Sequence, residues 1–130
     1  MKILVDSTVW IDFLRGTDTL QTRKLEYCIH NRDDICCCGF VLTEVFQGIK
    51  DEKQLFATKR HFAGLVYLED TRSTFELAAV IYRDLHKRGV TIRNSIDCLI
   101  AAVAIQTKVA FLENDRDYRY IGRCYPLNRI

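Results

Sequence analysis

The sequence has almost none of the features that mark membrane, secreted or low-complexity proteins. Its 130 residues include a single proline, Pro126, and contain no internal repeat and no apolar run long enough to cross a bilayer. The opening segment, Met1–Asp6, is too short and too soon acidic for a signal peptide. We therefore expect one cytosolic domain, since 48% hydrophobic and 28% charged residues are typical of globular proteins.

The cysteines lack the spacing of a disulfide framework or a zinc site. There is no Cys-x-x-Cys pair, and no histidine stands at zinc-ligand spacing from two of the cysteines, which are Cys28, Cys36, Cys37, Cys38, Cys98 and Cys124. We interpret them as small buried residues in a reducing compartment. A metal site at Cys36 and Cys38 is the alternative.

The charge of the chain does not by itself indicate a nucleic-acid binder, because the formal net charge is only +2. Its distribution is more informative. Basic residues form two candidate patches, which are Lys87, Arg88 and Arg93, and Arg116, Arg119 and Arg123. Beside an acidic cleft they would suit a polyanion whose phosphate is bound through a metal. A solvated face of mixed charge is the alternative for any one of them.

Short apolar segments alternate with helical patterns along the chain. We expect strands at residues 2–5, 35–38, 66–68, 109–112 and 123–125, and helices at about 9–15, 20–30, 42–48, 52–63, 71–87 and 95–107. Ser7 or Thr8 would cap the first helix and Ser95 the last. This alternation predicts an α/β domain with a central parallel sheet of four to five strands, flanked by helices on both faces.

Four carboxylates adjoin apolar runs, where an unpaired charge is costly. Asp6 follows residues 3–5, Glu44 lies inside 40–46, Asp97 lies at the start of 96–103, and Asp115 closely follows 109–112. No lysine or arginine lies inside these runs. An ionised carboxylate near a core destabilises the fold unless it is paired or coordinates a cation. Sites on parallel sheets form beyond the carboxyl ends of the strands, so we expect the four acids to meet there around a divalent cation.

Each acid taken alone has a second interpretation. Asp6 could be a turn residue or helix cap, and Asp97 an acid that stabilises the first turn of a helix. Glu44 could face solvent from an amphipathic helix, and Asp115 could belong to an ordinary loop. Only the joint pattern points to a metal site.

Four segments of the chain share residues, order and spacing with one known family. They are DSTVWIDFLRG at 6–16, TEVFQG at 43–48, RNSIDCLIAA at 93–102 and LENDRDY at 112–118. Together they resemble the motifs of PIN-domain proteins, more narrowly of VapC-type toxins from bacterial toxin–antitoxin pairs. The resemblance spans nearly the whole chain and implies a single PIN-like nuclease domain over residues 1–130, with the activity of a metal-dependent endoribonuclease.

The resemblance also implies roles for individual residues. Asp6, Glu44, Asp97 and Asp115 match the acidic quartet that binds Mg²⁺ or Mn²⁺ and carries catalysis. Asp117 resembles a supporting acid and competes with Asp115 for the fourth position. Two further residues match supporting positions, Ser7 as a hydroxyl that helps to position the metal shell and Asn94 as a neighbour of the third acid.

Substrate and partners follow from the same resemblance. It implies single-stranded or looped RNA as substrate, a homodimer, and a VapB-type antitoxin that occludes the acidic site. A metal-activated water would attack the phosphodiester. The expected RNA-binding rim comprises Lys87, Arg88, Arg93 and Arg116. Tyr118 and Tyr120 are interpreted as base-stacking or packing residues, and Trp10 as a core or dimer-interface residue.

Two other functions are open at this point. Asp6 at the end of a strand also suits a phosphatase or phosphotransfer domain, but position 8 is Thr where the haloacid-dehalogenase signature needs a second Asp. No clear receiver-domain pattern is present either. The other alternative is a non-catalytic RNA-binding or scaffold domain on the same fold, which has no need of a complete acidic quartet.

Overall fold

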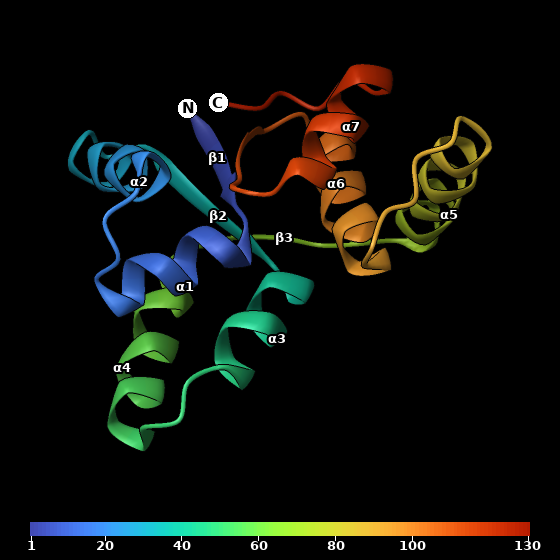
Figure 1. Cartoon of the computed structure of the whole chain (residues 1–130). Coiled ribbons are helices and arrows are strands. Elements are labelled where there is room, and N and C mark those ends of the chain that lie inside the picture. Colours follow the sequence, from blue (N-terminus) through green and yellow to red (C-terminus); the bar gives the residue numbers. More distant parts are fainter.

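The computed structural model describes all residues from 1 to 130 and contains one parallel sheet (Figure 1). Its strands are β1 (Lys2–Val5), β2 (Asp34–Cys38), β3 (Val66–Leu68) and β4 (Ala110–Leu112), in the spatial order β3-β2-β1-β4. All three strand pairs are parallel. The predicted parallel α/β architecture is therefore confirmed, with four strands.

Seven helices surround the sheet. They are α1 (Ser7–Arg15), α2 (Leu20–His30), α3 (Gly39–Gln47), α4 (Glu52–Ala63), α5 (Arg72–Lys87), α6 (Ser95–Thr107) and α7 (Arg116–Cys124). Figure 1 shows α1, α2 and α4 grouped on one side of the sheet, and α5, α6 and α7 on the other. None of the helices combines the length and hydrophobicity needed to cross a membrane.

Strand β1 lies at the centre of the core because it pairs with both β2 and β4. Ile3 stands beside Ile35 on one side and Ala110 on the other. The side chains of Ile3, Leu4 and Val5 are fully buried. A strand covered on both faces is continuously apolar rather than alternating. The carboxyl end of this buried strand delivers Asp6 to the edge of the sheet.

The predicted strand at residues 123–125 is wrong. Arg123 and Cys124 belong to the last turn of α7, whose buried residues Tyr118 and Ile121 follow a helical spacing. A three-residue apolar segment cannot distinguish strand from helix without that longer pattern. The chain returns to the sheet only after Pro126, where Arg129 forms an isolated bridge with Phe111 of β4.

The predicted caps of two helices are also wrong by one or two residues. Asp6, rather than Ser7 or Thr8, caps α1, and Asn94, rather than Ser95, caps α6. Each helix begins earlier than the apolar pattern indicates. Helix α3 likewise starts at Gly39 rather than near residue 42. A Cβ atom at Gly39 would lie 2.9 Å from the hydroxyl of Tyr67, so glycine permits this close approach.

The cysteines are free thiols, and all except Cys124 are buried. Burial raises the pKa of the thiols of Cys36, Cys37 and Cys38. No cysteine belongs to a group of side chains positioned to hold a metal ion. The structure therefore supports their interpretation as buried packing residues and does not support the alternative metal site at Cys36 and Cys38.

Candidate active site

The predicted acids lie on four segments that meet at the carboxyl end of the sheet. Asp6 directly follows β1, and Asp115 follows β4 after a short loop. These two segments are neighbours, since the Asp6 N–H donates to the carbonyl oxygen of Leu112 at 2.9 Å. Glu44 lies on α3, which follows β2, and Asp97 lies in the first turn of α6.

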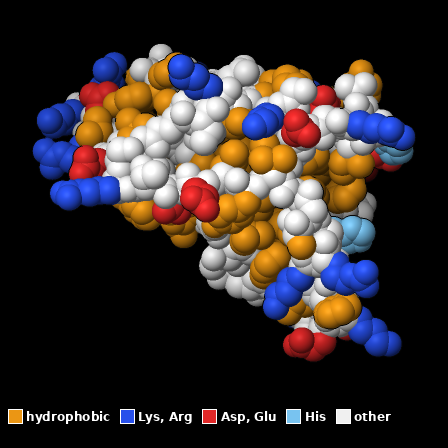
Figure 2. Space-filling model, turned by 180° about the vertical axis from the view of Figure 1, so that it is seen from behind, with side chains coloured by type: hydrophobic (Ala, Val, Ile, Leu, Met, Phe, Trp, Pro, Cys, Tyr) orange, Lys and Arg blue, Asp and Glu red, His pale blue; other side chains and the backbone are white.

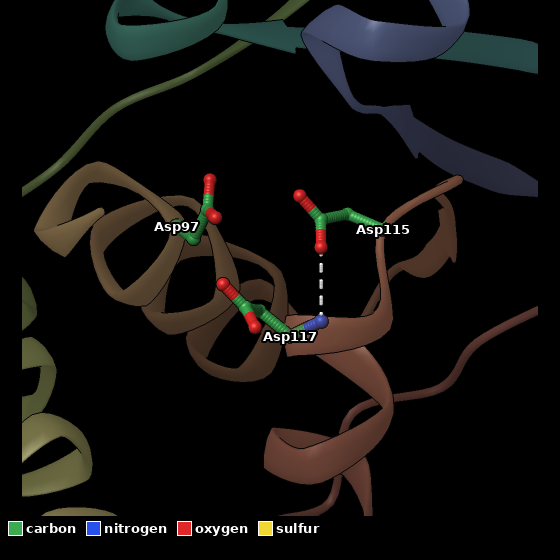
Figure 3. A group of neighbouring side chains, drawn as sticks. All are labelled: Asp97, Asp115 and Asp117. Atoms are coloured by element: carbon green, nitrogen blue, oxygen red, sulfur yellow. Dashed lines mark hydrogen bonds between the residues drawn. The ribbon is translucent and has the colours of Figure 1, made fainter. Parts of the chain in front are cut away.

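Three aspartates form a compact group of carboxylates. Asp97, Asp115 and Asp117 each offer an oxygen atom within 4.8 Å of the others. Figure 3 shows Asp97 approaching from α6, and Asp115 and Asp117 from the start of α7. Asp115 caps α7 by accepting the N–H of Asp117 at 3.0 Å, which keeps the two acids together. Both therefore lie in one group rather than in alternative positions.

Asp6 joins this group through a tyrosine. Its side chain is 1% exposed. Oδ1 accepts the hydroxyl of Tyr118 at 2.8 Å, and the same hydroxyl lies 3.2 Å from Oδ1 of Asp97. Oδ2 of Asp6 accepts the hydroxyl of Thr8 at 2.6 Å and the Thr8 N–H at 3.3 Å. Asp6 thus acts both as the cap of α1 and as a buried member of the site.

Glu44 is half-buried and is held by the predicted supporting residue Ser7. The Ser7 hydroxyl donates to Oε1 of Glu44 at 2.9 Å. Glu44 lies outside the compact group of three aspartates. Burial raises its pKa, and the nearby charge of Asp6 raises it further. Its second oxygen, Oε2, accepts no hydrogen bond from the chain.

Crowding and burial oppose full ionisation of the site. Burial raises the pKa of Asp6. It also raises the pKa of Asp97, to about 7, with further contributions from the charges of Asp6 and Asp115. The pKa of Tyr118 lies well above its usual range because of burial and the same two charges, so the hydroxyl keeps its hydrogen at neutral pH. Carboxylates in this state gain from a cation that offsets their repulsion.

One arginine contacts the group. Arg93 reaches Oδ1 of Asp115 at 3.1 Å and Oδ2 of Asp117 at 3.4 Å. The Arg93 side chain is 60% exposed, so solvent screens its pair with Asp115 and that pair contributes little to stability. Asp117, in the second pair, is buried. Arg93, predicted as part of the RNA-binding rim, thus contacts the acids directly. One exposed guanidinium leaves the site with an excess of negative charge.

The other predicted residues lie farther out or act indirectly. Asn94 caps α6 by accepting the N–H of Ile96 at 3.0 Å, and so positions the helix that carries Asp97. Arg116 is exposed in the first turn of α7. Lys87 and Arg88 lie at the C-terminal end of α5, which Figure 1 shows away from the start of α6. The structure does not bring these two residues to the acids.

Sequence reasoning missed a partly buried ion pair behind Asp115. Glu113 is 6% exposed, and its Oε2 accepts the N–H of Asp115 at 2.8 Å. Its Oε1 accepts Nε of Arg129 at 2.9 Å. The role of Tyr118 was missed as well. The helical spacing of Tyr118 and Ile121 was the available signal, since it turns both side chains inward from α7.

The donor set fits a hard divalent cation. The compact group offers only carboxylate oxygens, and no cysteine or histidine belongs to it. Oxygen ligands of this kind suit Mg²⁺, Ca²⁺ and Mn²⁺ rather than zinc or copper. The arrangement can therefore hold a cation next to an exposed arginine that can contact a phosphate.

Comparison with known proteins finds similarity over nearly the whole chain. The model of the PIN domain family matches residues 3–123. The VapC ribonuclease Mb1587 of Mycobacterium bovis and the ribonuclease VapC11 of Mycobacterium tuberculosis are each 30% identical over 123 residues, covering 93% of this chain and 92% of the relative.

Two solved structures share the fold over nearly the whole chain. VapBC2 from Rickettsia felis, bound to a DNA fragment from its promoter, superposes with a TM-score of 0.78 at 19% identity, covering 100% of this chain and 98% of the other. VapC20 of Mycobacterium tuberculosis, a sarcin-ricin loop cleaving toxin, gives 0.70 at 14% identity and 95% coverage of both chains.

Proposed function

The chain belongs to the PIN domain family, and from this premise we propose that it is a metal-dependent endoribonuclease acting as the toxin of a VapBC-type toxin–antitoxin pair. The observation that carries the proposal is the group formed by Asp97, Asp115 and Asp117, with Asp6 joined to it through Tyr118. The curated relatives, which are named as VapC ribonucleases, supply the substrate class.

The acids divide the chemical work between them. Asp6, Asp97, Asp115 and Asp117 would hold Mg²⁺ or Mn²⁺, which when bound supplies a polarised phosphoryl oxygen and a water of lowered pKa. Glu44 stands outside the compact group with Oε2 free and a raised pKa, which suits it to accept the proton of the attacking water at that atom. The exposed guanidinium of Arg93 would exchange its ion pair with Asp115 for a contact with the scissile phosphate.

RNA would approach along the basic residues beside the acids. Arg93 contacts the group directly, and Arg116 lies beside Asp115 in the chain; both side chains are exposed. Lys87 and Arg88 would contact the substrate farther from the cleaved bond. Loops and single strands leave the backbone accessible and the bases unstacked, so they suit an open acidic edge with a basic rim.

A protein partner would inhibit the enzyme. The related solved structures include VapBC complexes from Rickettsia felis, Haemophilus influenzae and Salmonella typhimurium, and we propose an antitoxin for this chain. An arginine from such a partner would match the carboxylates of the site in charge and geometry.

The chain is also proposed to form a homodimer. Figure 2 shows a face with apolar side chains over its middle and lysine and arginine side chains at its edges. The exposed apolar side chains of the protein include Tyr67, Phe75, Val80 and Tyr82. Apolar surface of this kind marks protein interfaces. Light scattering at micromolar concentration measures the mass, and a monomer alone would contradict this proposal.

Cleavage of RNA by the purified protein tests the nuclease. Total cellular RNA is incubated with wild type, Asp6→Asn or Asp97→Asn in Mg²⁺, Mn²⁺ or EDTA. We expect discrete fragments from the wild type with metal, and none with EDTA or with either variant. Asp34→Asn is the matched control, because Asp34 is exposed at the start of β2, at the opposite end of the sheet.

The result is decisive only for folded protein free of inhibitor. Absence of cleavage under every metal would favour a non-catalytic RNA-binding domain on the same fold. Cleavage that persists in both variants would mean that the acids are wrongly assigned or that another ribonuclease contaminates the preparation.

A further inference from the structure

A single hydroxyl group lies between two carboxylates of the site. Oη of Tyr118 donates to Oδ1 of Asp6 at 2.8 Å and lies 3.2 Å from Oδ1 of Asp97. Asp6 is 112 residues away in the chain and Asp97 is 21 residues away. The hydroxyl thus joins the end of β1, the first turn of α6 and α7 at one point.

Core packing determines where this hydroxyl lies. The Tyr118 side chain is fully buried. Its ring packs edge-on against Phe111 of β4, with ring centroids 4.8 Å apart and an interplanar angle of 75°. A buried ring held by a strand has few alternative rotamers. Its hydroxyl is therefore a fixed donor rather than a mobile surface group.

The two carboxylates depend on this donor to different degrees. Asp6 is also held through Oδ2 by Thr8, at 2.6 Å. The Asp97 carboxylate has no hydrogen-bonding neighbour in the chain other than the Tyr118 hydroxyl, at 3.2 Å. Each carboxylate oxygen has two lone pairs, so Oδ1 of either aspartate can accept the hydroxyl and still coordinate a cation.

We propose that Tyr118 is a positioning residue of the metal site, whose hydroxyl holds the carboxylates of Asp6 and Asp97 in the orientation that binds a divalent cation. This inference rests on the proposed nuclease function and adds a residue to it. Without the hydroxyl, two neighbouring carboxylates of like charge would have no shared donor between them and would turn apart. Residues that orient metal ligands in this way typically change metal affinity about 10- to 100-fold when they are removed.

The test is the Tyr118→Phe variant, which keeps the ring and removes only the hydroxyl. Calorimetric titration with Mn²⁺ in the absence of RNA measures the dissociation constant, which should rise about 10- to 100-fold. The Mn²⁺ concentration that gives half-maximal RNA cleavage should rise in the same proportion. At saturating Mn²⁺ the KM for RNA should equal that of the wild type, because Tyr118 is buried away from the substrate.

Tyr125→Phe is the matched control. It removes a tyrosine–carboxylate hydrogen bond of 2.9 Å to Asp84, which lies on α5 and outside the acidic group. Its Mn²⁺ affinity should equal that of the wild type. Unchanged Mn²⁺ affinity in Tyr118→Phe would overturn the positioning role and leave the nuclease assignment intact. A wild type that binds no Mn²⁺ would overturn both.

A second measurement decides the matter if Tyr118→Phe does not fold. In a crystal structure of the wild type with Mn²⁺, the hydroxyl should stay within hydrogen-bond distance, about 3.2 Å, of an oxygen of Asp6 and one of Asp97. A hydroxyl that has turned away from both carboxylates would overturn the proposal.

Discussion

The acidic residues of the site differ in the hydrogen-bond donors that contact their carboxylates. Asp6 has donors on both oxygens, from Tyr118 and Thr8, whereas Asp97 has Tyr118 alone. Glu44 is held by Ser7 on one oxygen. The pKa of Asp97 is raised to about 7. Its ionisation should therefore contribute to the pH dependence of the stability of the metal-free protein.

We expect the metal-free protein to lose stability as the pH rises. The pKa of Asp97 is raised from 3.8 to about 7 in the folded protein, so within that window the folded state binds more protons than the unfolded chain. Stability then falls as pH rises through the window and stays reduced above it. The burial of Asp6 acts in the same direction.

Thermal melting between about pH 5 and pH 8 measures this effect. In Asp97→Asn, the loss of folding stability between these pH values should be smaller by about 1–2 kcal/mol. This figure allows for the partial exposure of Asp97, which weakens the effect. Asp34→Asn is the control and should melt with the wild-type pH dependence. If Asp97→Asn also kept the full pH dependence, Asp97 would not be its source.

Helix α7 combines the buried and exposed parts of the site in nine residues. Its cap is Asp115, its inward face carries Asp117, Tyr118 and Ile121, and its exposed residues include arginines. Arg116, Arg119 and Arg123 form no ion pair with an acid of the chain. An element that starts at the acids and continues with unpaired arginines is suited to lead the RNA backbone to them.

We expect the double variant Arg116→Ala, Arg119→Ala to bind RNA more weakly at every sequence. Each lost phosphate contact should also lower the slope of log affinity against log salt by about 0.7. Fluorescence anisotropy with labelled single-stranded RNA across a salt series measures both, using catalytically inactive Asp97→Asn as background. Lys59→Ala, an exposed lysine on α4, is the control. An unchanged slope in the double variant would exclude α7 from the substrate path.

The molecule as a whole presents a second surface, apart from the acids. A mostly apolar cavity of about 410 Å³ is lined by residues that include Trp10, Phe13, Leu14, Ile29, Phe62 and Leu65. Nε1 of Trp10 is buried and has no hydrogen-bond partner. A buried donor without an acceptor destabilises the free protein. The proposed antitoxin would cover the cavity itself with an apolar segment.

Trp10→Phe tests that partner surface, because it keeps an aromatic ring and reduces the apolar lining of the cavity. We expect the affinity for the cognate antitoxin to fall about 2- to 10-fold, because the smaller ring offers less apolar contact area to the bound segment. RNA cleavage by the isolated variant should be unchanged. Phe56→Leu, at an exposed ring on α4 outside this cavity, is the control. Equal antitoxin affinity in the wild type and Trp10→Phe would place the antitoxin elsewhere.

Local sequence patterns were sufficient to predict most of the strands and helices and the first candidate acids of the site. Strands 2–5 and 66–68 and helices 20–30 and 52–63 agree with the structure because their patterns are read from adjacent residues. Parallel strands end at one edge, so acids placed after successive strands converge there in any sheet of this kind. Asp6 and Asp115 could therefore be predicted without coordinates, whereas Asp97, which follows a helix, was predicted from its apolar run and its motif.

Side-chain packing between distant segments settled what the patterns left open. The hydroxyl of Tyr118 reaches Asp6 because α7 packs on β4, which is the neighbour of β1 in the sheet. Asp117 joins Asp97, and Arg93 reaches both Asp115 and Asp117, for the same reason. These contacts depend on the angles and distances between helices and strands, which cannot be predicted from any single segment of the sequence. The chain's periodicity places the carboxylates at the edge of the sheet, and the packing of α6 and α7 determines which of them meet.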